Sequence, residues 1–162
     1  MGFTSDLKFG EDGEHQMVKY LMHQGLSYQG TSKELYPDKQ KQFDLVFNRK
    51  KQEILVEVKT DKYINDTRDT KNIVFEISCS GKPSGIETTE AHIWVNYFAN
   101  KKTDNVWMIK VDVLKRLISS LKETGEIVIK SGGDNNKVRL CVLPRNDFKE
   151  YFMIDTWVSE IV

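Results

Sequence analysis

Two short strand-forming runs separated by a polar turn constrain the fold of this chain more than any other feature. Residues 43–47 and 53–59 are rich in β-branched and aromatic side chains, and residues 48–52 between them are polar. This pattern predicts an antiparallel hairpin with its turn centred near Lys50 and Lys51. With that centre, Asp44 is expected to lie opposite Val56 or Glu57.

The remaining sequence predicts helices and strands in mixed order. Helical periodicity predicts one helix over residues 11–23 and a second, capped by Asp112, that ends near Leu121. Further strands are expected at 26–29, 73–78, 92–98, 106–111, 126–130, 138–143 and 151–157, and loops at 31–42, 61–72 and 81–85. We therefore expect a single α+β domain over residues 1–162, with a central mixed β-sheet flanked by helices and extra C-terminal strands.

The composition favours a globular protein of the cell interior. Hydrophobic residues make up 39% of the 162 residues, and no apolar stretch approaches the roughly 20 residues that span a bilayer. The first residues lack the basic and apolar regions of a signal peptide, so a cytoplasmic location without a membrane partner is expected. Cys79 and Cys141 have no metal-ligand spacing, which predicts two reduced and mostly buried thiols.

The charge balance bears on nucleic-acid binding. Lysine plus arginine and aspartate plus glutamate each number 24, so the formal net charge is zero. Nucleic-acid-binding domains are often strongly basic. Neutrality therefore argues against DNA binding unless a bound metal ion supplies positive charge beside the phosphates.

Charged residues of the predicted hairpin form a candidate metal site. Side chains alternate along a strand, so Glu57 and Lys59 share one face while Val56 and Val58 point into the core. Carboxylates as close as Asp44 and Glu57 repel each other, and a hard divalent cation removes that repulsion. Mg²⁺ prefers oxygen ligands, so Asp44, Glu57 and the backbone carbonyl of Val58 are its candidate ligands.

Two further residues complete this candidate site. Glu14 precedes Met17 by three residues and Leu21 by seven, which places it on the core-facing side of the first helix. A carboxylate there needs a partner, and a metal site on the sheet would provide one. Lys59 could orient or deprotonate an attacking water, or stabilise a pentavalent phosphorane. Cationic surroundings would depress the pKa of Lys59 and favour the role of a base.

In order and residue type, Gly10-x-x-x-Glu14, Asp44 and Glu57-Val58-Lys59 resemble the PD-(D/E)xK nuclease superfamily. The first half is most similar to archaeal-type Holliday-junction resolvases, and residues 72–91 resemble uncharacterised bacteriophage nucleases. This resemblance implies a restriction-endonuclease-like core and a Mg²⁺-dependent endonuclease in which Mn²⁺ can substitute. It implies metal ligands at Asp44 and Glu57, a catalytic lysine at Lys59 and a helix acid at Glu14.

The expected substrate is DNA, with a homodimer if the enzyme resolves four-way junctions, because two sites must then be placed symmetrically. Lys82, Ser84 and Gly85 are candidate DNA contacts, since a glycine-rich turn exposes backbone N–H groups; a plain tight turn between strands explains them equally well. Lys62 is a further candidate from a lysine-rich stretch beside the site, where a solvated charged face is the alternative. Glu76 is either an extra acid near the metal or a charge at a sheet edge. The alternative function is an inactive nuclease-fold module that binds DNA or serves as a subunit of a larger DNA-processing complex.

Overall fold

The computed structural model describes residues 3–61, 67–99, 101–103, 105–132 and 134–155. Within these ranges ten strands form two sheets. The strands are β1 (Ser27–Thr31), β2 (Leu45–Arg49), β3 (Gln52–Asp61), β4 (Asn72–Cys79), β5 (Lys82–Pro83), β6 (Ile93–Phe98), β7 (Val106–Lys110), β8 (Val128–Gly132), β9 (Val138–Pro144) and β10 (Met153–Ile154). The helices are α1 (Phe3–His23), α2 (Ser32–Leu35), α3 (Val111–Thr124) and α4 (Arg145–Phe148), with short 3₁₀ turns η1 (Pro37–Lys39), η2 (Gly85–Glu87), η3 (Asp134–Asn136) and η4 (Lys149–Tyr151).

The larger sheet is mixed, and β3 lies near its centre. Its strand order is β1-β2-β3-β6-β7-β10, and the smaller sheet has the order β5-β4-β9-β8. β3 is antiparallel to β2 but parallel to β6. A parallel neighbour requires a crossover connection, and here residues between β3 and β6 include β4, β5 and η2 of the smaller sheet. The expected mixed sheet flanked by helices, with extra C-terminal strands, is confirmed.

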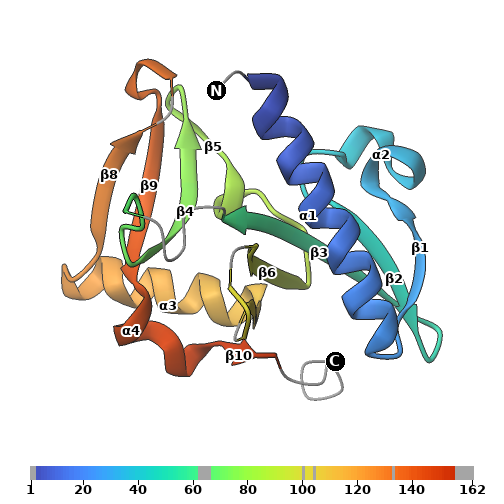
Figure 1. Ribbon diagram of the computed structural model, residues 1–162. Coiled ribbons are helices and arrows are strands. Elements are labelled where there is room, and N and C mark those ends of the chain that lie inside the picture. The colour runs from blue at the N-terminus through green and yellow to red at the C-terminus, as the bar shows by residue number, and fades with distance from the viewer. Residues whose placement is uncertain (1–2, 62–66, 100, 104, 133, 156–162) are drawn as a thin grey trace.

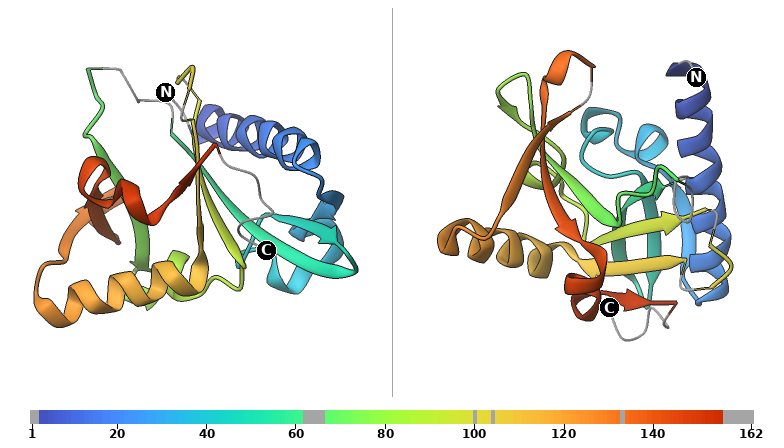
Figure 2. Two further views of the ribbon diagram at one scale, coloured as in Figure 1. Left: turned by 90° about the horizontal axis from the view of Figure 1, so that it is seen from below. Right: turned by 60° about the vertical axis from the view of Figure 1, so that its left-hand side comes forward.

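Both faces of the larger sheet are covered. On one face, α1 contributes Met17 and Leu21 to a buried cluster that includes Val56 and Val58. On the other face, α3 and the smaller sheet pack against a second cluster; the rings of Phe75 on β4 and Trp94 on β6 lie 5.5 Å apart. Figure 1 shows α1 crossing the larger sheet beside the upright strands of the smaller sheet, and the left view of Figure 2 shows α1 and α3 on opposite sides.

The predicted hairpin is present with the expected turn. β2 and β3 pair in the register Arg49↔Gln52 to Leu45↔Val56. Lys50 and Lys51, which form the two-residue turn, both have positive φ, at 48° and 68°. Two successive positive φ values match the twist of the flanking strands. The turn geometry therefore fixes the register that brings residue 44 beside the middle of β3.

Several predicted boundaries were wrong. α1 begins at Phe3 rather than at residue 11. The prediction began too late because the first turns of this helix have little apolar periodicity. Residues 31–42 are not all loop: the Thr31 hydroxyl accepts a hydrogen bond from the Glu34 N–H and the Glu34 carboxylate accepts from the Thr31 N–H, which starts α2. Asp112 is not the N-cap of α3, because β7 runs directly into the helix and Lys110 takes that position.

Three other expectations are corrected or lie outside the described residues. Residues 81–85 contain the short strand β5, which pairs with β4. Of the two free thiols, Cys141 is buried but Cys79 is exposed, because it ends a strand at the rim of the smaller sheet. The predicted strand at 151–157 is reduced to Met153–Ile154, and its last two residues lie outside the described ranges, as does Lys62.

The packing of α1 on β3 depends on a glycine. A Cβ atom built on Gly13 would lie 1.9 Å from Oγ1 and 2.8 Å from Cβ of Thr60, whereas one built on Gly10 would meet nothing within 4 Å. The helix therefore approaches β3 more closely at residue 13 than any side chain permits. This approach sets the distance between Glu14, the next residue, and the sheet.

We predict opposite stability effects for two alanine substitutions in α1. Gly10→Ala should stabilise the protein by about 0.5–1 kcal/mol, because alanine is the better helix former. Gly13→Ala should destabilise it by about 1–3 kcal/mol, because the added methyl group forces α1 away from Thr60. Thermal unfolding of both variants measures the difference. A stabilising Gly13→Ala would contradict the close approach.

Candidate functional site

Glu57 and Lys59 occupy the face of β3 that α1 does not cover. Glu57 pairs with Trp94 and Lys59 with Asn96 in the parallel register. Glu57 is buried at 7% exposure, and its Oε1 lies 2.5 Å from the Lys59 Nζ, which belongs to a half-exposed side chain. The Lys59 ammonium also lies 5.6 Å from the centroid of the Trp94 ring. Glu57 and Lys59 therefore lie on the same face of β3, as predicted, and the Glu57 side chain is buried.

Asp44 lies beside this pair and is fixed by the backbone of β3. The Asp44 N–H donates to the Val56 carbonyl at 2.9 Å, and the Val58 N–H donates to Asp44 Oδ2 at 2.7 Å. The two hydrogen bonds bracket Glu57. The hairpin thus brings Asp44 to the position that its turn predicts.

The backbone of Val58 offers an oxygen on the same side. The N–H and the carbonyl of one strand residue point toward the same neighbouring strand. Because the Val58 N–H donates to Asp44, the Val58 carbonyl also faces the β2 side, where the β2–β3 ladder has already ended at Val56. This carbonyl is therefore directed toward the space beside Asp44.

Glu14 approaches from α1. It is half-buried and lines, with Asp44, a hollow of about 500 Å³ between α1 and the start of β2. Burial and the nearby Asp44 carboxylate raise the pKa of Glu14 to about 7. Such a carboxylate is unfavourable when charged and gains from a cation close to it.

The electrostatics of the other three groups are linked. Burial raises the pKa of Asp44, against the opposing effects of Lys59 and of the Val58 N–H. Burial also raises the pKa of Glu57, and the neighbouring Asp44 and Glu76 carboxylates add to this effect. For Lys59, burial acts to lower the pKa, but Glu57 and Asp44 outweigh it and the pKa is raised. Carboxylates of the protein surround Lys59 and favour its charged form. The cationic surroundings expected from a bound metal ion stay a prediction.

Glu76 on β4 belongs to the same neighbourhood. Its carboxylate contributes to the raised pKa values of both Glu57 and Lys59. Gly85 packs on it so closely that an added Cβ would lie 2.4 Å from the Glu76 carbonyl oxygen. Lys82 is exposed on β5, and Ser84 immediately precedes η2, so residues 82–85 form a tight connection beside β4.

Three of the four predicted residues line two different hollows, and Glu57 lines neither. Glu14 and Asp44 line the one beside α1, whereas Lys59 lines a second one of about 540 Å³ near the carboxyl ends of β3 and β6. Among the described residues, no three Asp, Glu, His or Cys side chains are grouped closely enough to hold one metal ion. Glu57 is instead held by Lys59. A cation joining Glu14, Asp44 and Glu57 thus requires side-chain adjustment.

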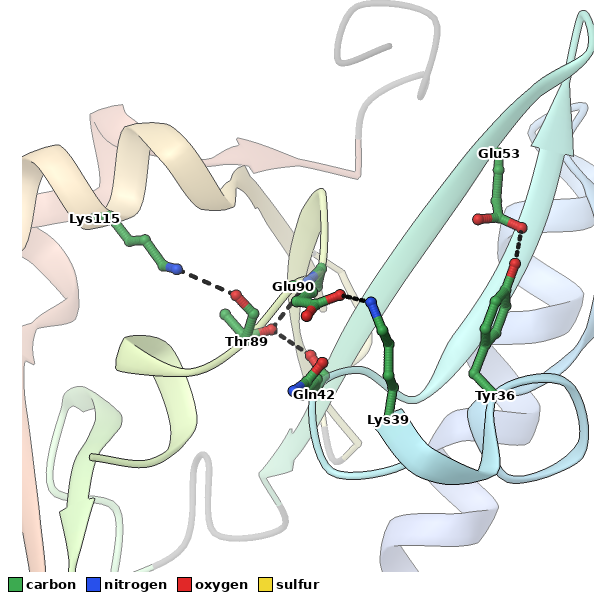
Figure 3. A network of polar contacts seen from close by, with 8 residues as sticks. Tyr36, Lys39, Gln42, Glu53, Thr89, Glu90 and Lys115 are labelled. Carbon is green, nitrogen blue, oxygen red and sulfur yellow. Dashed lines mark hydrogen bonds and ion pairs between the residues drawn. The ribbon is translucent and has the colours of Figure 1, made fainter. Parts of the chain in front are cut away.

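A polar network behind the site fixes the segment that leads to Asp44 (Figure 3). The Thr89 hydroxyl donates to the Gln42 carbonyl at 2.7 Å and accepts from the Ala91 N–H at 3.1 Å. The Lys39 ammonium pairs with Glu90 at 2.5 Å. These contacts connect the residues before β2 to those before β6. The sequence does not predict this network, because a single threonine in a loop has no recognisable pattern.

Loss of the Thr89 hydroxyl should loosen this connection. We predict that Thr89→Val destabilises the protein by about 1–3 kcal/mol, because the buried Ala91 N–H loses its acceptor. Thr88→Val is the matched control, since Thr88 is exposed and its hydroxyl lies 3.4 Å from the Gly85 carbonyl. Urea unfolding compares the two. Equal losses in both variants would show that the network is not a structural tie.

Glu14 should make the metal-free protein less stable as the pH rises. Its pKa is about 7 in the folded protein against 4.5 as an ordinary carboxylate. Between pH 4.5 and about 7 the folded state therefore binds more protons than the unfolded state. The free energy of unfolding consequently falls as the pH rises through this range. In EDTA, Glu14→Gln should unfold at a higher temperature than the parent protein above pH 7, and the gap should close below pH 4.5.

Asp12→Asn, an exposed acid on the same helix, is the control for simple loss of charge. Its unfolding temperature should follow that of the parent at every pH. If Glu14→Gln also followed the parent over the whole range, the carboxylate would not be destabilised by its surroundings.

No protein-family model matches this chain, and neither a curated protein nor a solved structure matches it. Among the described residues, no helix has both the length and the apolar character needed to cross a membrane.

Proposed function

We propose that this protein is a Mg²⁺-dependent DNA endonuclease of the PD-(D/E)xK type, with Glu14, Asp44, Glu57 and Lys59 in its active site. The observation that carries the proposal is the hydrogen bond that holds Asp44 to the β3 backbone beside the ion pair of the buried Glu57 with Lys59. If Glu57 and Lys59 were an ordinary charged pair on a solvated sheet face, the carboxylate of Glu57 would be exposed rather than buried on a central strand. The order of these residues along the chain, which resembles that of PD-(D/E)xK nucleases, further supports the proposal.

The donor set fits a hard divalent cation. Asp44 and Glu57 provide carboxylate oxygens, and the Val58 carbonyl faces the same space. Burial is the first cause of the raised pKa values of all three acids, and it makes their charged forms unfavourable without a nearby cation. Mg²⁺ or Mn²⁺, which take oxygen ligands, would supply that cation, with Glu14 as a further ligand after movement of its side chain.

The residues of this chain would then divide the work of hydrolysis. When bound, Mg²⁺ supplies positive charge that acidifies water and neutralises the phosphate. Asp44 and Glu57 hold the cation in a fixed place on rigid strands. Lys59, whose charged form is favoured by its acidic neighbours, donates hydrogen bonds to the phosphate oxygens as charge builds on them. We expect the products to carry a 5′-phosphate.

Substitution of the central residues tests this proposal. Asp44→Asn and Glu57→Gln should abolish Mg²⁺-dependent cleavage, because each removes one negative ligand while keeping the side-chain shape. Lys59→Met should reduce cleavage by about 10²–10⁴-fold, because the charge on the reacting phosphate loses a donor. The assay compares four-way junctions, flaps, single strands and duplex ends with Mg²⁺, Mn²⁺ or EDTA.

Asp112→Asn and Lys110→Met are matched controls at the junction of β7 and α3, where both side chains are exposed; they should cut like the parent protein. Full cleavage by folded Asp44→Asn would end the proposal. DNA binding without cleavage by the parent protein in both metals would instead indicate a non-cutting module. A homodimer stays a prediction, and it follows from this function only for a four-way junction substrate.

A further inference from the structure

A buried amide without a partner lies next to the proposed catalytic lysine. Asn96 is in the middle of β6, at 5% exposure, and it pairs with Lys59 across the parallel ladder. Among the described residues, its Nδ2 has no hydrogen-bond partner. An unpaired buried donor costs about 1–3 kcal/mol, so a ligand that supplies the acceptor would recover this energy.

Asn96 also lines a hollow of suitable size. The hollow holds about 540 Å³, within the range of about 300–1,000 Å³ found for small-ligand pockets. Its wall comes from α1, β3, β4, β6 and residues 68–70 before β4, near the carboxyl ends of the two parallel strands, where open α/β sheets bind ligands. Figure 1 shows the carboxyl end of β3 directed toward β4. Lys59 belongs both to this wall and to the proposed active site.

Several side chains of the lining can contact an anion. Lys59 and Arg68 supply positive charge, and Asn72, Thr60 and Thr70 supply polar side chains. Two acids, Asp61 and Asp69, also line the hollow. The charge of Asp69 is balanced from behind, since Arg145 donates to both of its oxygens, at 2.7 and 2.6 Å, and the Lys71 ammonium lies 2.9 Å away.

The back of the hollow is rigid. Arg145 is buried at 7% exposure and lies over the ring of Phe98, with its guanidinium carbon 5.5 Å from the ring centroid. Phe98 follows Asn96 by two residues, so both side chains point to the same face of β6. Asn96 is thus held between Trp94 and Phe98, both of which are buried.

From these observations we infer that this hollow binds a phosphate group of the DNA strand next to the bond that is cut, with Asn96 as a positioning residue. Asn96 Nδ2 donates to a non-bridging oxygen of that phosphate, and Lys59 faces the same strand from β3. This inference rests on the proposed nuclease function. It goes beyond it by assigning a substrate subsite and a residue that the active-site pattern does not include.

The test compares Asn96→Leu with the parent protein. A fluorescent single-stranded oligodeoxynucleotide is titrated in EDTA and again with Ca²⁺, alongside the same sequence with an uncharged methylphosphonate backbone. Asn96→Leu should weaken binding of the phosphodiester strand by about tenfold, the worth of one hydrogen bond to a charged group. Binding of the methylphosphonate strand should be weaker for the parent and unchanged by the substitution.

Thermal unfolding separates this role from a structural one. Asn96→Leu should unfold at the same temperature as the parent or higher, because the unpaired donor is gone. If Asn96→Leu does not fold, Asn96→Asp takes its place in the binding assay. This variant keeps the size of the side chain but repels phosphate, so it should also weaken binding of the phosphodiester strand. Asn48→Leu is the matched control, because Asn48 lies on β2 and does not line the hollow.

Unchanged phosphodiester binding by the folded Asn96 variants would overturn the inference, and so would an equal loss for the methylphosphonate strand. The nuclease proposal fails separately. Cleavage at the parent rate by folded Asn96→Leu would leave a nuclease without this subsite, whereas an Asn96-dependent binding of DNA without cleavage would leave the subsite without a nuclease.

Discussion

The burial of a carboxylate on the central strand of a sheet that is covered on both faces is the constraint on which this structure depends. Glu57 lies between the hairpin partner β2 and the parallel partner β6, at 7% exposure. An isolated buried charge is very unfavourable. Lys59 compensates it at 2.5 Å, but Asp44, Glu14 and Glu76 add further negative charge. The folded chain therefore retains an electrostatic conflict at its centre, which is a common property of functional sites.

The residues around the site hold these carboxylates close together. Gly13 lets α1 approach β3 closely enough to hold Glu14 near the other acids. The Val58 N–H fixes one oxygen of Asp44, and the Thr89 network fixes the residues before Asp44. Each of these contacts restricts where a carboxylate can move. A site that binds a metal through fixed ligands needs this kind of support from the residues behind it.

Much of the site could be predicted because it lies on a local hairpin. The alternation of residues 56–59 and the two-residue turn at Lys50–Lys51 determine which side chains meet, without any long-range information. Asn96 could not be found in this way, since a polar residue within an apolar strand does not reveal which neighbours it lacks. A signal existed for α2, where Thr31 and Glu34 have the spacing of a capping box. The smaller sheet joins β4 and β5, which lie between β3 and β6 in the chain, to β8 and β9, which follow α3; these pairings are remote in sequence, and no local pattern shows them.

The parallel pairing of β3 with β6 has a consequence for how the chain reaches its native state. The hairpin of β2 and β3 closes over a turn of two residues, a local step. Bringing β6 alongside β3 must close the loop formed by residues 62–92, and the entropy of that closure makes such long-range contacts slow to form. We therefore expect the acids of the hairpin to meet early during folding, and the wall that contains Asn96 to be completed among the last steps.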